Sequence, residues 1–142
     1  MGAGLVIDHY ADLATQLRAL GIDDVDLVFS TSATSRYLAS IVEVLRPFGH
    51  LALIDAPGSL DLEAFAGKSL SLHSEMVFSR IVADGDIGSQ GRILARVADD
   101  VVAGRLRPIA TTTLKGLTAE TMRTAHTLVE TGRTIGKTVI AL

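Results

Sequence analysis

The sequence contains no cysteine and no tryptophan, and aromatic residues make up only 4% of its 142 residues. The lack of cysteine excludes disulfide bonds and thiolate zinc ligands within this chain. The sequence also has no apolar run close to the ~20 residues that a membrane-spanning helix needs. Because 48% of the residues are hydrophobic, a chain of this length can still form a core, and this core has to consist of aliphatic side chains.

An excess of charge of one sign is also missing. The 13 Lys and Arg residues against 16 Asp and Glu residues give a net charge of −3, which is not the basic pattern that binds nucleic acid or anionic lipid. No charged segment followed by an apolar block marks a secretory signal at the start of the sequence. We therefore expect a cytoplasmic protein without nucleic-acid or membrane partners.

A third missing feature is a glycine-rich phosphate loop. Neither Gly-x-Gly-x-x-Gly nor Gly-x-x-x-x-Gly-Lys-Ser/Thr occurs in the sequence, although sheets that bind dinucleotides normally carry the first motif after their first strand. This absence either lowers the odds of nucleotide binding or indicates a chain that begins after that turn.

Short aliphatic segments alternate with amphipathic ones along the first 103 residues, a pattern typical of parallel α/β sheets. Strands are predicted at residues 4–8, 25–29, 50–54 and 69–73. Helices are predicted at residues 13–20, 37–45 and 93–101, with a helical turn at 60–66 and a loop at 84–86. The remaining tail is predicted to form a strand at 108–114, a helix capped by Thr118 and a strand at 138–142.

The segment Lys68–Phe78 resembles the last sheet strand and exit loop of zinc-type alcohol dehydrogenase-like and quinone oxidoreductase-like proteins, which belong to the medium-chain dehydrogenase/reductase superfamily. The segment Gly132–Val139 is similar to a C-terminal landmark of that family. The segments 25–29 and 50–54 resemble its fourth and fifth strands in order and spacing. Ser74 departs from the pattern, since this branch usually has tryptophan there.

The resemblance covers the whole chain and implies an α/β fold. It would consist of a partial Rossmann-type parallel sheet (strands three to six of the doubly wound order) and a C-terminal strand–helix–strand unit. Residues 1–104 would be the partial dinucleotide-binding domain, and residues 105–142 the return segment of the catalytic domain. The chain would then be a C-terminal fragment of a longer protein.

By the same resemblance, the longer protein is an NAD(P)-dependent oxidoreductase that transfers a hydride between NAD(P)H and a carbonyl, alcohol or quinone. The fragment itself is expected to be inactive and to bind NADP or NAD weakly or not at all. No catalytic or metal-binding residue is assigned to it. One alternative is a non-catalytic domain that works by dimerisation. Another is a receiver-like phosphoacceptor module, in which Asp8, Asp55 and Lys68 would converge on Mg²⁺.

Two strand ends carry the candidate cofactor-binding residues. Ser30 and Thr31 follow the strand at 25–29, at the carboxyl end where ligands bind in open α/β sheets. The resemblance implies that this turn touches the nicotinamide ribose, and a simple turn cap is the alternative. Ile54 and Asp55 end the next strand. By resemblance their backbone lies along the nicotinamide, although Asp55 also suits a turn.

Other polar side chains have weaker signals. Lys137 precedes the last strand, where a basic residue of related enzymes contacts the cofactor pyrophosphate, and a solvated charge is the alternative. His73 lies in a strand without a carboxylate or cysteine at ligand spacing, so we expect it to be structural. The same is expected of His50 and His126.

The resemblance also leaves open sheet edges. In the family, two further strands lie between strands three and four, so we expect the strand at 4–8 to pair in another way, within the chain or with another copy. The strand Ser69–Met76 would be a long apolar edge that needs covering. We expect it to join two copies into a homodimer.

Overall fold

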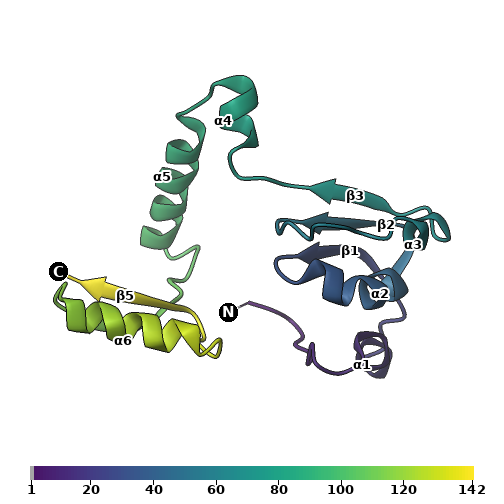
Figure 1. Ribbon diagram of the computed structural model, residues 1–142, viewed down its shortest axis with the longest axis horizontal. Helices are drawn as coiled ribbons and strands as arrows, with labels where there is room; N and C mark the ends of the chain where they lie inside the picture. The colour runs from purple at the N-terminus through teal and green to yellow at the C-terminus, as the bar shows by residue number, and fades with distance from the viewer. Residues whose placement is uncertain (1) are drawn as a thin grey trace. The chain divides into compact units, whose positions relative to one another are not determined.

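The computed structural model describes residues 2–142, with the side chain of Asp84 left out. The chain forms two compact units, one of residues 3–87 and one that runs from Gly88 to the C-terminus. Each unit has its own parallel sheet (Figure 1), which confirms the predicted α/β class. The domain boundary expected after residue 104 stays a prediction. None of the helices in the described part is long and apolar enough to cross a membrane.

The first unit is built around three parallel strands in the order β1-β2-β3. They are β1 (Val25–Ser30), β2 (Leu45–Leu53) and β3 (Ser71–Ser74), and the crossovers contain α2 (Thr34–Val44) and α3 (Glu63–Ala66). Three of the four predicted strands are thus confirmed. Strands that follow one another along the chain lie side by side here, as short crossovers favour.

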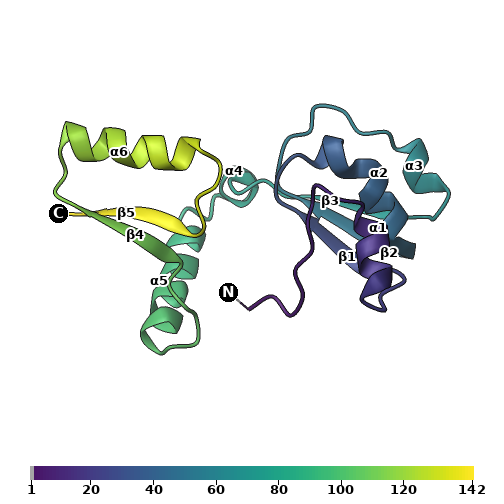
Figure 2. The ribbon, with the colours of Figure 1, turned by 90° about the horizontal axis from the view of Figure 1, so that it is seen from below.

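A single aliphatic core lies between α2 and one face of this sheet. Leu38 and Ile41 of α2 meet the fully buried Leu51 of β2 and Phe65 of α3 there. Figure 2 shows α2 and α3 on the same side of the strands. Because this core is the only cluster of buried hydrophobic residues in the described chain, the position of α2 decides the stability of the unit.

The other face of the sheet carries exposed apolar side chains. Successive residues of a strand point to opposite faces, and the register pairs Leu27 with His50 and Phe29 with Ala52. Leu27 and Phe29 are 58% and 60% exposed. The open face consists of Leu27, Phe29, His50, Ala52, Ser71 and His73.

Helix α1 (Leu13–Ala19) confirms the prediction of a helix at 13–20. Asp12 caps its N-terminus, since the carboxylate accepts a hydrogen bond from the Thr15 N–H at 2.7 Å. The Thr15 side chain and this N–H lower the pKa of Asp12. An ion pair between Arg18 and Glu43 at 3.1 Å joins α1 to α2.

The strand predicted at residues 4–8 does not form. Leu5 and Val6 are 57% and 84% exposed, and the segment has no strand conformation, so the prediction that it pairs within the chain is wrong. A strand needs a neighbour that satisfies its N–H and C=O groups. Here no neighbouring strand does so; at the end of the segment the side-chain amide of Gln16 accepts from the Asp8 N–H and donates to the Asp8 carbonyl, both at 2.8 Å, and the Ala11 N–H donates to the same carbonyl at 3.2 Å. Pairing with another copy stays a prediction.

Two further boundaries differ from the predicted ones. β2 begins at Leu45, directly after α2 and earlier than residue 50, because the chain stays extended through Pro47 once the helix has ended. A short helix, α4 (Ser79–Asp84), lies where no helix was predicted, and Gly85 with φ of 67° ends it.

The second unit has little buried surface. It contains α5 (Ser89–Val102), β4 (Ala110–Lys115), α6 (Ala119–Glu130) and β5 (Lys137–Ala141). β4 and β5 pair in parallel through the crossover helix α6, as predicted for the tail. Thr118 caps α6 by accepting from the Thr121 N–H at 3.1 Å. Ser89, which is 6% exposed, is the only buried residue in the described part of this unit, so the unit lacks a core of its own.

Candidate functional site

The candidate cofactor edge of the first unit is formed where β1 and β2 end. Carboxyl ends of parallel strands meet at one edge of a sheet, and the Ile54 N–H donates to the Ser30 carbonyl at 3.2 Å. Ser30 is buried, whereas Thr31 is exposed and Ile54 is 48% exposed. The structure therefore brings together the residues that the sequence singled out at the two strand ends, and it leaves Thr31 and Ile54 open to solvent.

Thr34, the first residue of α2, links the two strand ends. Its N–H donates to Oδ2 of Asp55 at 2.8 Å, and its hydroxyl donates to Oδ1 of the same carboxylate. Since the single hydroxyl hydrogen of Thr34 is used in this way, Ser30 has to donate the hydrogen of the 2.7 Å bond between the two hydroxyls. Sequence reasoning missed Thr34, and no local signal could have found it, because the N-cap of α2 is Ala33 and Thr34 contacts a residue 21 positions away.

These contacts give Asp55 a role within the chain. Hydrogen bonds from the Thr34 side chain and N–H lower the pKa of Asp55, and an anion at this position suits the positive N-terminal end of α2. The side chain of Asp55 thus fixes α2 to the end of β2.

Lys68 holds α2 at its other end. Its Nζ donates to the carbonyl oxygens of Val42, Glu43 and Leu45 at 2.9, 2.8 and 2.7 Å. Lys68 and Asp55 are therefore separated by the length of an 11-residue helix, which is about 16 Å. They do not converge on one metal ion, as the phosphoacceptor alternative requires.

Lys137 lies in the second unit, where it opens β5. Its side chain is exposed, and its backbone N–H donates to the Ile109 carbonyl at 2.7 Å. The positions of the two units relative to each other are not determined, so a contact between Lys137 and a cofactor at the first unit stays a prediction.

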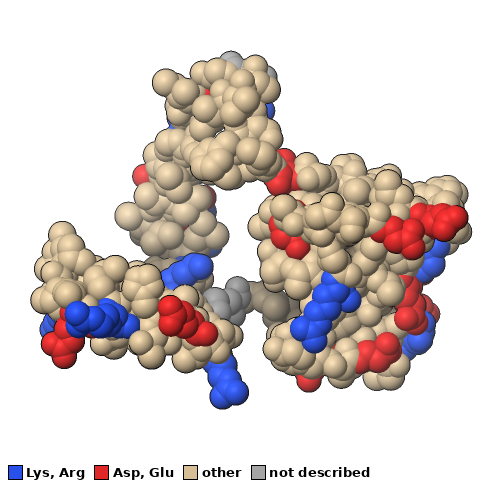
Figure 3. Space-filling model, in the orientation of Figure 1, with Lys and Arg blue, Asp and Glu red and all other residues tan. Residues whose placement is uncertain are grey.

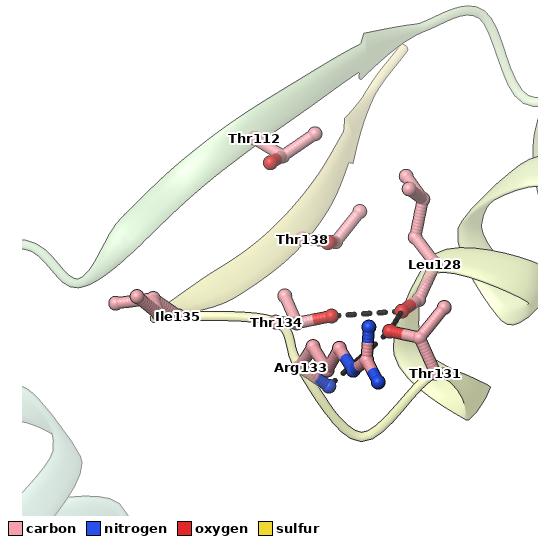
Figure 4. A pocket seen from close by; sticks show the side chains of 7 residues that line it. All are labelled: Thr112, Leu128, Thr131, Arg133, Thr134, Ile135 and Thr138. Atoms are coloured by element: carbon pink, nitrogen blue, oxygen red, sulfur yellow. Dashed lines mark hydrogen bonds between the residues drawn. The ribbon is translucent and has the colours of Figure 1, made fainter.

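A pocket of about 240 Å³ lies beside this residue, between the β4–β5 sheet and the C-terminal end of α6 (Figure 4). Its lining consists of Thr112, Leu128, Thr131, Arg133, Thr134, Ile135 and Thr138. The hydroxyls of Thr131 and Thr134 both donate to the Leu128 carbonyl, at 2.7 and 2.8 Å. The pocket is thus lined by the side chains at the end of α6 and by those that connect this helix to the start of β5.

The described residues do not fit a zinc ion of the usual kind. Protein zinc sites use three or four Cys, His, Asp or Glu ligands. The described part of the chain has no group of three or more such side chains close enough to hold a metal ion, and the sequence has no cysteine.

Comparisons with known proteins agree with this fold. A family model described as "Zinc-binding dehydrogenase" matches residues 1–140. A zinc-type alcohol dehydrogenase-like protein of Staphylococcus aureus is 34% identical in an alignment of 142 positions that covers 99% of this chain and 42% of that protein. A protein of the same description from Staphylococcus epidermidis is 33% identical, and the match covers 100% of this chain and 43% of that protein.

Solved structures give the same result. A candidate zinc-dependent alcohol dehydrogenase from Rhizobium etli is 39% identical with a TM-score of 0.85, and the match covers 99% of this chain and 42% of that one. An NAD-dependent alcohol dehydrogenase is 20% identical with a TM-score of 0.72 over 99% of this chain and 38% of its own, which supports the fold alone. This chain thus spans less than half the length of these relatives. Because the family model matches nearly the whole chain, the protein belongs to the zinc-binding dehydrogenase family of alcohol dehydrogenase-like oxidoreductases.

Proposed function

We propose that this chain is the part of an NAD(P)-dependent oxidoreductase that positions the nicotinamide end of the cofactor. The complete protein would transfer a hydride between NAD(P)H and a carbonyl, alcohol or quinone. The observation that carries the proposal is the cofactor edge, where Thr34 fixes the ends of β1 and β2 together through Ser30 and Asp55. Ligands of open α/β sheets bind at such an edge.

The residues at this edge would orient the cofactor and take no part in proton transfer. Asp55 is hydrogen-bonded as an anion to Thr34, so it is not available as a general acid. Thr31 and Ile54 are exposed there, where they can contact a nicotinamide ribose and ring. When bound, the cofactor supplies the hydride chemistry. No step is assigned to zinc, because the described residues contain no group of three or more ligands that could form a zinc site of the usual kind.

We propose that the chain by itself binds dinucleotide weakly or not at all and is inactive. It has no glycine-rich loop to hold a pyrophosphate through backbone N–H groups. Basic and acidic side chains are interspersed on the face that Figure 3 shows, so that face offers no basic patch as a substitute. A cytoplasmic location, supported by the cysteine-free composition, is part of the same proposal.

A chimera tests this function. The first part of the Rhizobium etli relative, joined to residues 1–142 of this chain in place of its own matching segment, should bind NADH or NADPH, as measured by the fluorescence of the reduced nicotinamide. Ile54→Asp should weaken the affinity by at least about tenfold, or 1.4 kcal/mol, because it places a charge at the edge. Leu62→Asp, at another exposed position, is the matched control and should have no effect.

The isolated 142-residue chain should show no saturable binding at millimolar dinucleotide. If this chain alone bound a dinucleotide with micromolar affinity, the proposal that binding requires a glycine-rich phosphate loop would be wrong. A chimera that is folded by circular dichroism but binds neither dinucleotide would contradict the proposed role of the edge.

We further propose a homodimer formed through Ser69–Met76. β3 pairs with β2 on one side only, and the Glu75 N–H donates to the Leu53 carbonyl. Because N–H groups alternate in direction along a strand, the Ser74 N–H points to the outer edge. Ser74→Pro should therefore convert a dimer to a monomer in sedimentation experiments, whereas Ser74→Ala should not. A wild-type chain that is monomeric at high concentration would contradict the proposal.

A further inference from the structure

The register of the sheet brings two histidines of neighbouring strands together on the open face. His50 of β2 lies beside Ser71 of β3, and His73 lies beside Ala52, so the two histidines are diagonal neighbours. Both are exposed. Nδ1 of His50 is 3.1 Å from Nε2 of His73, and the ring centroids are 5.3 Å apart. Sequence reasoning treated each histidine alone and missed this pair.

We propose that His50 and His73 form a binding site for a divalent transition-metal ion, namely Cu²⁺, Ni²⁺ or Zn²⁺. Imidazole nitrogens bind such ions at about 2.0–2.1 Å. Two nitrogens that bind one ion at angles of about 90–110° are then about 2.9–3.4 Å apart. The 3.1 Å separation of the two facing nitrogens falls within this range, so both can bind one ion once each ring has turned by about 40°, which moves its lone pair from the line between the nitrogens towards the ion.

Metal binding requires one of the two rings to change which nitrogen carries its hydrogen. One of the facing nitrogens has to carry a hydrogen in the N···N hydrogen bond. In the metal-bound form both facing nitrogens donate their lone pairs, and the hydrogens are on Nε2 of His50 and Nδ1 of His73. Solvent can move the hydrogen within one ring because both rings are exposed.

The composition of the site determines which ions it selects. In the described chain no third potential metal ligand, such as a carboxylate, joins the two histidines. The pair therefore offers nitrogen ligands and not the oxygen ligands that Mg²⁺ and Ca²⁺ need. Water would take the remaining positions, with the Ser71 hydroxyl beside His50. Imidazole ligands bind Cu²⁺ with higher affinity than they bind Ni²⁺ or Zn²⁺. The site differs from a usual family-type zinc site because it has only two protein ligands.

The pair is also separate from the cofactor edge. It shares no residue with that edge: His50 lies four residues before Ile54, about 13 Å along the strand, and His73 lies beside Ala52, two residues before Ile54, about 7 Å along the strand. Metal binding at the pair therefore does not depend on whether the proposed cofactor function is correct.

The test is metal titration of the complete 142-residue chain, produced without a histidine tag, by calorimetry in a buffer that does not bind metals. We expect saturable binding of one Cu²⁺, weaker binding of Ni²⁺ and Zn²⁺, and none of Mg²⁺. His50→Gln and His73→Gln should each weaken Cu²⁺ binding by at least about tenfold, because one imidazole alone loses the second, intramolecular contact. His9→Gln and His126→Gln replace the other two of the four histidines and should change nothing.

Nitrogen NMR gives a second readout. Zn²⁺ should shift the resonances of Nδ1 of His50 and Nε2 of His73 more than those of the two control histidines. Absence of saturable Cu²⁺ and Ni²⁺ binding, or equal binding by the His50→Gln variant, would overturn the proposal and leave the pair as a hydrogen bond only. Since both histidines are exposed, circular dichroism should show that all four variants keep the fold.

Discussion

Replacement of Lys68 by methionine tests how α2 is held over the sheet. Methionine keeps most of the aliphatic chain but removes the ammonium group, which donates to the carbonyls of Val42, Glu43 and Leu45. These carbonyls belong to the last turn of α2 and the first residue of β2. The change therefore removes contacts at the joint between the core helix and the central strand.

The size of the effect follows from these contacts. A hydrogen bond that involves a charged group contributes about 1.5–3 kcal/mol net, and a cation at a helix C-terminus contributes about 0.3–1 kcal/mol. Lys68 is half-buried, so water can replace part of the lost bonds and the three contributions do not add. We expect the free energy of unfolding to fall by about 2 kcal/mol, which lowers the urea midpoint by about 1 M.

The assay is urea unfolding followed by far-ultraviolet circular dichroism. Lys115→Met removes the same charge from an exposed position of β4 and is the matched control, with an expected change below about 0.5 kcal/mol. A Lys68→Met midpoint equal to that of the control would show that the ammonium group is solvated and that α2 is not held in this way.

Two further predictions concern the other described contacts. Asp55→Asn should reduce stability near neutral pH, and the difference from wild type should disappear in acid, because the Thr34 hydrogen bonds lower the pKa of Asp55 in the folded state. The sign is that of a depressed acid: the stabilisation is complete above the unfolded pKa of about 3.9 and is lost as the pH falls through the folded pKa. Unfolding curves measured from acidic to neutral pH check this, and a difference that persists in strong acid would contradict it. Gly136→Ala should disrupt the β4–β5 pairing, since a Cβ there would collide with the Ile109 carbonyl. Gly132→Ala also has a positive φ but open space and should cost only about 1–2 kcal/mol, so equal hydrogen-exchange protection of β5 in the two variants would refute the close approach.

The local spacing of apolar residues was sufficient to predict most helices and strands. The helices at 13–20 and 37–45 were predicted from apolar residues at helical spacing, and Thr118 from its position before such a pattern; all three predictions are confirmed. The strand at 4–8 had an equally good local pattern and does not form. The reason is that a helix satisfies its own backbone groups, whereas a strand depends on a neighbour.

The candidate site was predictable only in part. Ser30 and Asp55 were singled out because they follow strands that run in parallel. Their connection through Thr34 was not predicted, because it depends on how α2 is placed at the edge of the sheet. The position of Lys68 at the other end of α2 was likewise not predicted, because it depends on the folded chain.

The sequence by itself determined the family, the α/β class and the alternation of strands and helices. These follow from composition, from residue spacing and from a resemblance that extends along the whole chain. Only the tertiary structure decided that segment 4–8 remains unpaired, that Asp55 and Lys68 hold opposite ends of α2, and that His50 and His73 face each other. Each of these depends on residues far apart in the chain, whose distances are set by strand register and helix docking and not by local preference.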